Sequence, residues 1–288
     1  MIVARAPAST ANLGPGFDAA AAALDLWNHV EIEEGTFAVE IDGEGAGELP
    51  RDASHLAVQA FALLTPPAAY RFRFTNAIPL ERGLGSSAAA IGLGLVAGAA
   101  AGGQSLAVRD LLTLGASLES HIDNLAAVLS GGVCVAWREG GPHVRRIADD
   151  LPADTIAVVP SQRTSTAASR TALPDTVSHA DAAVSAGAAM LLGAAIAAGD
   201  ADLLRHSFRD RLHEPFRSAG APLLDRVKHL VPEALGVTLS GSGPTVVVWV
   251  VDAVDRDRIA TQLAAELGTA AAVLPLGVAH EGAAAQVH

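Results

Sequence analysis

Two glycine-rich segments of the chain have the composition of loops that bind an anion through the backbone. The first is Gly83-Leu-Gly-Ser-Ser-Ala-Ala89, which follows Pro79 and precedes a long apolar run. Its glycines permit positive φ angles and close approach, and the serines open a predicted helix whose first N–H groups lack partners within the helix. Taken alone, the segment also fits a tight strand-to-helix turn capped by serine. It is neither a Walker A loop, because no Gly-Lys-Ser/Thr follows, nor a dinucleotide fingerprint, because the third glycine and the later acid are missing.

The second glycine-rich segment is Leu239-Ser-Gly-Ser-Gly-Pro-Thr245, which lies between two apolar, strand-like runs. It fits a plain β-turn. It also fits a backbone that packs directly against a phosphate or against the first glycine loop, and the density of glycine favours this second interpretation.

A third polar segment, Ala6-Pro-Ala-Ser-Thr-Ala-Asn-Leu-Gly-Pro-Gly-Phe-Asp18, places Asn12 and Asp18 around a Gly-Pro-Gly turn. The Asn12 amide can both donate and accept hydrogen bonds, and the Asp18 carboxylate can hold a substrate ammonium group. A loop with Asn and Asp is by itself more often a capped turn than a binding site. The three segments together therefore carry the argument.

The apolar patterns that surround these segments predict an α+β chain. Alternating patterns predict strands, among them a hairpin, and 3.6-residue patterns predict helices. The expected strands are residues 2–6, 28–34 and 36–41 (the hairpin), 70–75, 132–137, 144–147, 155–159, 237–239, 245–251 and 271–276. The expected helices are residues 52–64 with Ser54 as N-cap, a long one after the first glycine loop, 106–118, 181–198, 201–211, 222–229 and 255–267.

A charged bend that contains proline, at residues 148–153, predicts the boundary between two lobes. We expect residues 1–150 to hold the first glycine loop and residues 151–288 to hold the second. With 288 residues, each lobe is long enough to bury its own core.

The composition excludes several classes of protein. The formal net charge of −12 argues against nucleic acid or an anionic membrane as a partner, because both require a basic surface. The N-terminus lacks the pattern of a signal peptide, so we expect a cytoplasmic protein. The apolar run at residues 88–101 is too short for a bilayer span and predicts a buried helix. The single cysteine, Cys134, lies in an apolar run and is interpreted as core filler.

In this order and spacing, the three segments resemble the motifs of the GHMP family of small-molecule kinases, and most closely its homoserine kinases. The resemblance extends over nearly the whole chain. It implies a two-lobed GHMP kinase fold: an N-terminal lobe like domain 2 of ribosomal protein S5 and a ferredoxin-like α/β C-terminal lobe, with nucleotide and substrate between them. It also implies transfer of the ATP γ-phosphoryl group to the side-chain hydroxyl of L-homoserine, which gives O-phospho-L-homoserine for threonine biosynthesis, by a homodimer.

The resemblance assigns the nucleotide and metal contacts to the two glycine loops and one acid. The ATP contacts it implies are Pro79, Arg82, Gly83, Leu84, Gly85, Ser86, Ser87, Ala88, Ala89, Gly241, Ser242 and Gly243. The implied Mg²⁺ ligands are Ser87 and Glu119. Glu119 stands only two residues before His121, closer than the corresponding acid in the family, and it is preferred to Asp110, which lies at the start of a predicted helix. The contacts of the adenine base stay open, because the chain has Ser54-His55 where relatives often carry an Asn.

Further segments assign the acceptor end in the same way. One segment, His121-Ile-Asp-Asn124, resembles a homoserine kinase signature. Residues 165–170 resemble a family segment that approaches the substrate hydroxyl and carboxylate. The stretch Glu214-Pro-Phe-Arg217 resembles a second segment that binds the carboxylate. The resemblance implies Asn12, Asp18, His121, Asp123, Arg170 and Arg217 as substrate contacts and Asn124, Thr166 and Arg170 as catalytic residues. Two Arg side chains suit one α-carboxylate, because the planar guanidinium binds carboxylate bidentately.

The only lysine, Lys228, lies outside all of these motifs, so a lysine-assisted base is not expected. Three alternatives stay open: a GHMP kinase for threonine, one for mevalonate, and a non-catalytic ligand sensor on the same fold. Mevalonate has no ammonium group for Asp18 and Asp123 to hold. The intact glycine loops count against the sensor.

Overall fold

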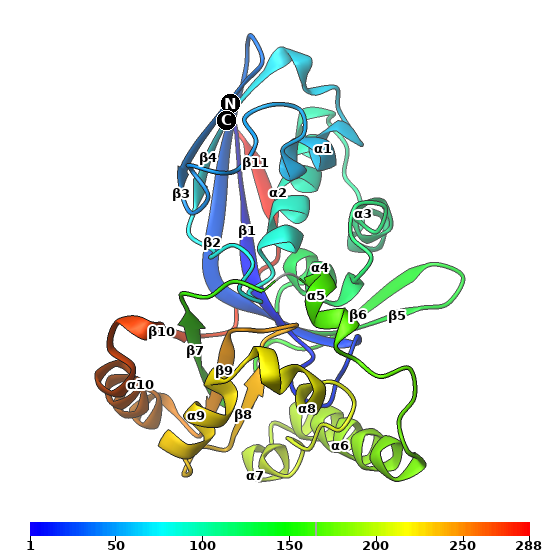
Figure 1. Ribbon diagram of the computed structural model, residues 1–288. Helices are drawn as coiled ribbons and strands as arrows, with labels where there is room; N and C mark the ends of the chain where they lie inside the picture. Colours follow the sequence, from blue (N-terminus) through cyan, green and yellow to red (C-terminus); the bar gives the residue numbers. More distant parts are fainter. Residues whose placement is uncertain (165) are drawn as a thin grey trace.

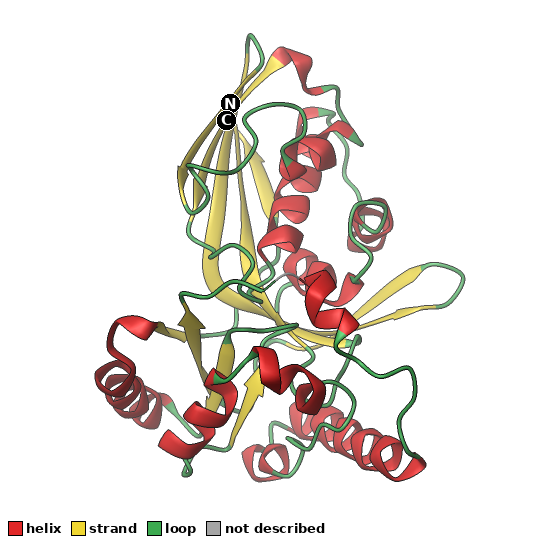
Figure 2. Ribbon diagram, viewed as in Figure 1, coloured by secondary structure: helices red, strands yellow, loops and turns green. Residues whose placement is uncertain are grey.

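The computed structural model describes residues 1–164 and 166–288, and the side chains of all of these except residues 166–168 and 219. The described residues form two sheets, of seven and four strands, each covered by helices (Figures 1 and 2). The architecture is α+β, as the apolar patterns predict.

The first sheet has the order β11-β1-β2-β4-β3, with β5 paired to β2 and β6 paired to β5. Its strands are β1 (Ile2–Ala11), β2 (Ala20–Glu34), β3 (Ala38–Gly43), β4 (Tyr70–Asn76), β5 (Val133–Arg138), β6 (Pro142–Ala148) and β11 (Ala284–Val287). The helices of this lobe are α1 (Leu56–Ala62), α2 (Ser86–Ala101), α3 (Val108–Gly115) and α4 (Ile122–Ser130). Helices α2 and α4 lie on one face of the sheet, and α1 and α3 pack on their outer side (Figure 1).

Helix α2 carries the first glycine loop at its N-terminus, and its position is fixed by burial on nearly all sides. Gly94 and Gly98 allow α1 to approach the α2 backbone, because a Cβ on Gly98 would stand 2.7 Å from the carbonyl oxygen of Phe61. The small, apolar composition of residues 88–101 is therefore the composition of a buried core helix, as predicted.

The predicted hairpin of residues 28–34 and 36–41 is wrong. Strand β4 lies between β2 and β3, antiparallel to β2 and parallel to β3. In this arrangement Arg73 of β4 pairs with Glu31 of β2 and Glu40 of β3 on the exposed face. A direct hairpin would instead bring strands with several exposed glutamates side by side, and like charges on adjacent strands are destabilising.

The second sheet has the order β10-β7-β9-β8, and all neighbours are antiparallel, which is the ferredoxin-like arrangement. Its strands are β7 (Asp154–Pro160), β8 (Gly236–Leu239), β9 (Val246–Val250) and β10 (Ala271–Leu276). The helices of this half are α5 (Thr166–Thr171), α6 (His179–Ala198), α7 (Ala201–Arg205), α8 (Glu214–Arg217), α9 (Leu223–Leu230) and α10 (Ala253–Leu267). Helices α9 and α10 pack on the second sheet (Figure 1).

Several boundaries differ from the expected ones. Strand β1 continues to Ala11 where a loop is predicted from residue 8, and the helix predicted at residues 201–211 ends at Arg205. The N-cap of α1 is His55, not Ser54. Strand β11 is not predicted at all, and it returns the end of the chain to the first sheet beside β1. The division into residues 1–150 and 151–288 stays a prediction.

A shared apolar cluster joins the two lobes. It combines Leu13 and Ala22 of the first lobe with Leu192 of α6 and Trp249 of β9, all almost fully buried. Helix α6 has 20 residues, and an 18-residue window of it has a mean hydropathy of 1.6, so its length and composition would allow it to cross a bilayer. Core helices of soluble proteins also have these properties, and the feature alone assigns no membrane location.

Candidate active site

A cavity of about 280 Å³ is lined by residues from both lobes. It brings together most of the predicted site residues: Asn12, Asp18, Gly83, Gly85, Ser86, Ser87, Ala88, Glu119, His121, Asp123, Asn124, Arg170, Arg217, Gly241 and Ser242. The predicted contacts Pro79, Arg82, Leu84, Ala89 and Gly243 do not line it. The side chain of Thr166 lies outside the described residues. We call this space the first cavity.

The two glycine loops pack against each other at one end of the first cavity. A Cβ on Gly83 would overlap the carbonyl oxygen of Ser240 and stand 2.8 Å from that of Gly243. The Ser240 hydroxyl donates to the carbonyl of Gly83 at 2.6 Å and lies 2.9 Å from the hydroxyl of Thr10. Gly85 has a φ of +69° directly before α2. The N-terminus of α2 therefore opens into the cavity and offers N–H groups and a positive dipole end to an anion.

Glu119 stands opposite the start of α2. Its Oε2 is 3.3 Å from Ser87 Oγ, and its Oε1 accepts from the backbone N–H of His121 at 3.2 Å. Burial raises the pKa of the Glu119 carboxyl, but the hydrogen bonds from His121 outweigh this effect and the pKa lies below its ordinary value. The hydrogen bond with Glu119 in turn raises the pKa of His121.

Ser87 and Glu119 together fit a magnesium ion, which is typically held by one or two protein oxygens, substrate phosphates and water. The described residues contain no group of three or more His, Cys, Asp or Glu side chains that would form an all-protein metal cage.

Asn124 lies between the glycine loop and the acidic residues of the cavity. Its Oδ1 accepts a hydrogen bond from Ser9 Oγ at 2.9 Å, and its backbone N–H donates to the Asp123 carboxylate at 2.7 Å. Asp123 is 4% exposed, and burial raises its pKa. A cation that enters beside Asp123 would therefore pair with a carboxylate that has little access to water.

Arg170 forms an ion pair with Asp18 across the cavity, with N–O distances of 2.7 and 2.8 Å. The loop that carries Asp18 is held by Asn12, whose Oδ1 accepts from the backbone N–H of Asp18 and whose Nδ2 donates to the carbonyl of Gly241 at 2.8 Å. Asn12 and Asp18 both have positive φ angles, of 71° and 55°. The Asn12 side chain therefore links the first polar loop to the second glycine loop.

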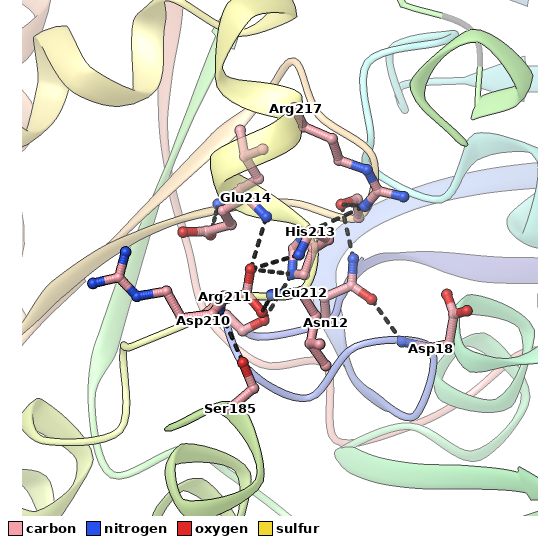
Figure 3. A network of polar contacts seen from close by, with 12 residues as sticks. Asn12, Asp18, Ser185, Asp210, Arg211, Leu212, His213, Glu214 and Arg217 are labelled. Carbon is pink, nitrogen blue, oxygen red and sulfur yellow. Dashed lines mark hydrogen bonds and ion pairs between the residues drawn. The ribbon is translucent and has the colours of Figure 1, made fainter. Parts of the chain in front are cut away.

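Arg217 is the second predicted carboxylate partner, and a buried network fixes its orientation (Figure 3). The guanidinium donates to the Gly241 carbonyl and to His213 Nδ1, both at 3.2 Å. Since Arg can only donate, Nδ1 of His213 accepts, and its Nε2–H donates to the Gly14 carbonyl at 2.8 Å. Burial lowers the pKa of His213, which keeps the imidazole neutral as this pattern requires. The Nε atom of Arg217 has no partner among the described residues.

Arg82 does not line the first cavity, and its side chain holds backbone segments together instead. Its guanidinium donates to the carbonyls of Pro160, Leu80 and Ser161 at 2.9–3.1 Å. It therefore ties the first glycine loop to the end of β7 in the second lobe.

A second cavity, of about 300 Å³, adjoins the first and shares Glu81, Ser86 and Ser87 with it. Apolar side chains form much of its wall, namely Leu49, Leu56, Leu80, Leu93 and Phe74. His55, Asn28, Asn76 and Arg163 also line it, and Arg163 forms a bidentate pair with Glu48 at 2.6 Å.

Sequence reasoning assigned Ser86 and Ser87 of the second cavity but not its other residues, and it did not assign three neighbours of the first cavity. Glu81 and Thr164 line the first cavity, and Ser9 holds Asn124. Ser9 belongs to the polar segment of residues 6–18, and its place in that segment is the sequence signal that could have assigned it to the site. Apart from Glu81, Ser86 and Ser87, which belong to the segment around the first glycine loop, the residues around the second cavity come from several separate segments and share no motif.

Comparison with known proteins identifies the class to which this fold and site belong. The model for the GHMP kinases N terminal domain matches residues 53–132, and that for the GHMP kinases C terminal region matches residues 185–269. The chain belongs to the GHMP kinase family, whose members are ATP-dependent phosphotransferases. The family confirms the predicted two-lobed fold.

Within this family, the chain is similar to homoserine kinases. It is 40% identical to the homoserine kinase of Moorella thermoacetica over 260 residues, which are 86% of this chain and 87% of that protein. It is 40% identical to that of Streptomyces coelicolor over 293 residues, or 97% and 92% of the two chains. The crystal structure of homoserine kinase from Cytophaga hutchinsonii superposes with a TM-score of 0.87 at 25% identity, covering 99% of this chain and 97% of that one.

Proposed function

We propose that this chain transfers the γ-phosphoryl group of ATP to the side-chain hydroxyl of L-homoserine. The observation that carries the proposal is the composition of the first cavity. It combines the N-terminus of α2 and the two packed glycine loops with two carboxylates, Asp18 and Asp123, and two guanidinium groups, Arg170 and Arg217. This combination suits a triphosphate beside a zwitterionic amino acid. The homoserine kinases among the relatives support it.

The nucleotide lies along the start of α2. The backbone N–H groups of Ser86, Ser87 and Ala88 receive its phosphates, and its nucleoside enters the second cavity, which Ser86 and Ser87 also line. Ser87 and Glu119 would hold Mg²⁺, and the ion would supply positive charge to neutralise the phosphates.

The amino acid lies at the opposite end of the first cavity. Asp123 and Asp18 face its ammonium group, and Arg170 and Arg217 face its α-carboxylate. The existing Asp18–Arg170 ion pair opens as the ammonium and carboxylate groups take over its two partners.

The transfer itself depends on positioning and on charge neutralisation, which supply most of the catalysis in phosphoryl transfer. Asn124 orients the hydroxyl, because Ser9 fixes its Oδ1 and Asp123 accepts from its backbone. Thr166 assists in this role. No lysine is available, and the hydroxyl proton passes ultimately to phosphate.

The test is ADP release from Mg-ATP with L-homoserine, L-threonine, L-serine and mevalonate. Release confined to L-homoserine, with O-phospho-L-homoserine as product, supports the proposal. Preference for another acceptor keeps the family and overturns the substrate. ATP binding without turnover of any acceptor supports the ligand sensor instead.

We also propose that the protein acts in the cytoplasm as a homodimer without nucleic-acid or membrane partners. The net charge of −12 supports the absence of a nucleic-acid partner. Light scattering coupled to size exclusion measures the oligomeric state directly.

A further inference from the structure

Phe17 does not line the first cavity, but it contacts two side chains that do. The Cζ atom of Arg170 lies over the Phe17 ring at 5.2 Å from the ring centroid, and that of Arg217 lies over the same ring at 5.4 Å. Both distances fall within the range of about 6 Å in which an aromatic ring attracts a cation. One aromatic side chain therefore contacts both guanidinium groups that face the cavity.

The two arginines reach this ring from different elements. Arg170 belongs to α5 and Arg217 to α8, whereas Phe17 lies in the loop between β1 and β2 of the first lobe. Burial lowers the pKa of Arg217, and although Asp18 raises it, the positive charge of Arg170 lowers it further. The two guanidinium groups therefore repel each other, and the shared ring offsets part of this repulsion because it attracts both.

The Phe17 ring is itself held in place by its neighbours. It stacks on the imidazole of His213, with centroids 5.0 Å apart and planes at 17°. His213 is fully buried, and its Nε2–H donates to the Gly14 carbonyl at 2.8 Å. The backbone before the ring is also fixed, because the N–H of Gly16 donates to the carbonyl of Asn12 at 2.8 Å. Phe17 therefore offers the arginines a contact of defined position.

Arg170 depends on such a contact because its ion pair with Asp18 has to open. The Arg170 side chain is 43% exposed, and in the proposed function the substrate takes over both partners of that ion pair. Ordering an exposed Arg side chain on binding weakens affinity, and a partner that stays in place reduces this loss. A cation–π contact requires no N–H donor, so the guanidinium can contact the ring and bind a carboxylate at the same time.

We infer that Phe17 is a positioning residue for the acceptor: its ring holds the guanidinium groups of Arg170 and Arg217 together at the first cavity, where they bind one α-carboxylate. The inference rests on the proposed function, because it takes these two arginines as the carboxylate partners. Phe17 contacts neither the reacting hydroxyl nor the phosphates. Its effect belongs to the affinity for the acceptor and not to the rate of phosphoryl transfer.

The experiment replaces Phe17 by mono-, di- and trifluorinated phenylalanine and measures steady-state kinetics. Fluorine withdraws electrons from the ring and weakens its attraction for a cation step by step, while the shape of the ring changes little. The KM for L-homoserine should rise with each fluorine, to about fivefold in the trifluorinated protein, with kcat and the KM for ATP unchanged. A KM for L-homoserine that stays constant across the series overturns the inference.

Two further measurements separate positioning of the arginines from other roles. The compound 3-aminopropan-1-ol is L-homoserine with hydrogen in place of the α-carboxylate, so its inhibition constant should be the same in the wild-type and trifluorinated proteins. An inhibition constant that rises together with the KM for L-homoserine would show that Phe17 does not act through the carboxylate, and would overturn the inference. The melting temperature should stay constant across the series, and a fall in step with the rise in KM would make Phe17 a packing residue.

Phe37 provides the matched control. It is half-buried like Phe17, its ring packs against Phe72 of β4 with centroids 6.2 Å apart, and it lines neither cavity. The same fluorinated series at Phe37 should leave the KM for L-homoserine unchanged, and a rise equal to that at Phe17 would contradict the inference. If the wild type neither binds nor phosphorylates L-homoserine, the proposed function fails and the inference fails with it. That result differs from normal turnover with a KM that fluorination at Phe17 does not alter.

Discussion

Arg170 is an exposed side chain whose charge is already matched in the protein without substrate. Its side chain is 43% exposed and pairs with Asp18. We expect Arg170→Ala to raise the KM for L-homoserine by about tenfold or more, because one of two α-carboxylate partners is lost, and to change the KM for ATP by less than about twofold. Steady-state kinetics with each substrate varied measures both constants.

Arg258→Ala is the control for this change. Arg258 is similarly exposed and ion-paired, with Glu233 and Asp255, but it lies on α10 away from both cavities. Neither KM should change. An equal rise of both KM values in Arg170→Ala would contradict its assignment to the acceptor.

A substitution at Glu119 tests the proposed metal site. Its lowered pKa keeps the carboxylate ionised at neutral pH, 3.3 Å from Ser87 Oγ. Glu119→Gln keeps the shape and removes the charge, so we expect the Mg²⁺ concentration at half-maximal activity to rise by about tenfold or more. A magnesium titration at saturating ATP and L-homoserine measures this value.

Asp110→Asn provides the comparison, because Asp110 is the other acid considered for the metal. It lies in the first turn of α3 and does not line the first cavity. Its titration should match that of the wild type. A shift in Asp110→Asn with none in Glu119→Gln would transfer the role to Asp110.

A site residue could be predicted from the sequence only where a local sequence motif marks it. Asn12, Asp18, Asp123 and Arg217 belong to short motifs of polar residues, glycine and proline, and the first cavity brings them together. His55 was noted only because it stands where relatives often carry an Asn; its burial against Phe74 and its two unpaired nitrogens were not predicted. These properties exist only after β4 and α1 pack, so no local pattern records them.

The first glycine loop is the element that joins the two lobes at the site. Gly83 has a φ of +81°, and a Cβ there would collide with the backbone of Ser240 and Gly243. We expect Gly83→Ala to lower the free energy of unfolding by more than about 2 kcal/mol, and to raise the KM for ATP, because backbone strain and backbone overlap add. Denaturant unfolding and ATP kinetics measure the two effects.

Gly103→Ala separates strain from overlap. Gly103 has a φ of +62° at the end of α2, and a Cβ there would meet nothing within 4 Å. Gly103→Ala should lower the free energy of unfolding by only about 1 kcal/mol and leave the KM for ATP unchanged. Equal effects of the two substitutions would show that the packing of the glycine loops does not matter for ATP.

Elements with strong periodicity or glycine punctuation were predicted well, and elements defined by distant partners were not. The alternation of Phe72 and Phe74 with Arg71 and Arg73 predicts β4 directly. Strand pairing could not be predicted in this way, because β3 pairs with β4 and β11 pairs with β1, and these partners lie far from them in the sequence. The predicted hairpin failed because adjacency in sequence was used where the sheet is assembled from segments far apart.

At the scale of the whole molecule, the stability of the fold should depend on pH through a carboxyl group buried behind the site. Glu214 of α8 is 8% exposed, its Oε1 accepts from the backbone N–H of Leu239 at 2.7 Å, and Oε2 is 3.8 Å from Lys228 Nζ. Burial raises the pKa of Glu214 to about 7 from 4.5, against the opposing effect of Lys228. The folded protein therefore holds this proton more tightly than the unfolded chain.

The sign of the effect follows from this difference. Between about pH 4.5 and pH 7 the unfolded chain has released the proton and the folded protein has not, so rising pH destabilises the fold, by roughly 3 kcal/mol once pH 7 is passed. His213, whose pKa is lowered by burial, acts in the opposite direction below its ordinary pKa of 6.5. The total pH profile mixes both groups, and a substitution at Glu214 isolates one of them.

Glu214→Gln keeps an oxygen that can accept from Leu239 and removes the ionisation. We expect its free energy of unfolding to equal that of the wild type near pH 5 and to exceed it by about 2–3 kcal/mol near pH 8, because only the wild type must then bury a carboxylate. Urea unfolding at several pH values measures the difference, and Glu266→Gln, an exposed site on α10, should show none. A constant difference between Glu214→Gln and the wild type from pH 5 to pH 8 would mean that the Glu214 proton is held equally in the folded and unfolded states, and burial behind the second glycine loop would then not control its charge.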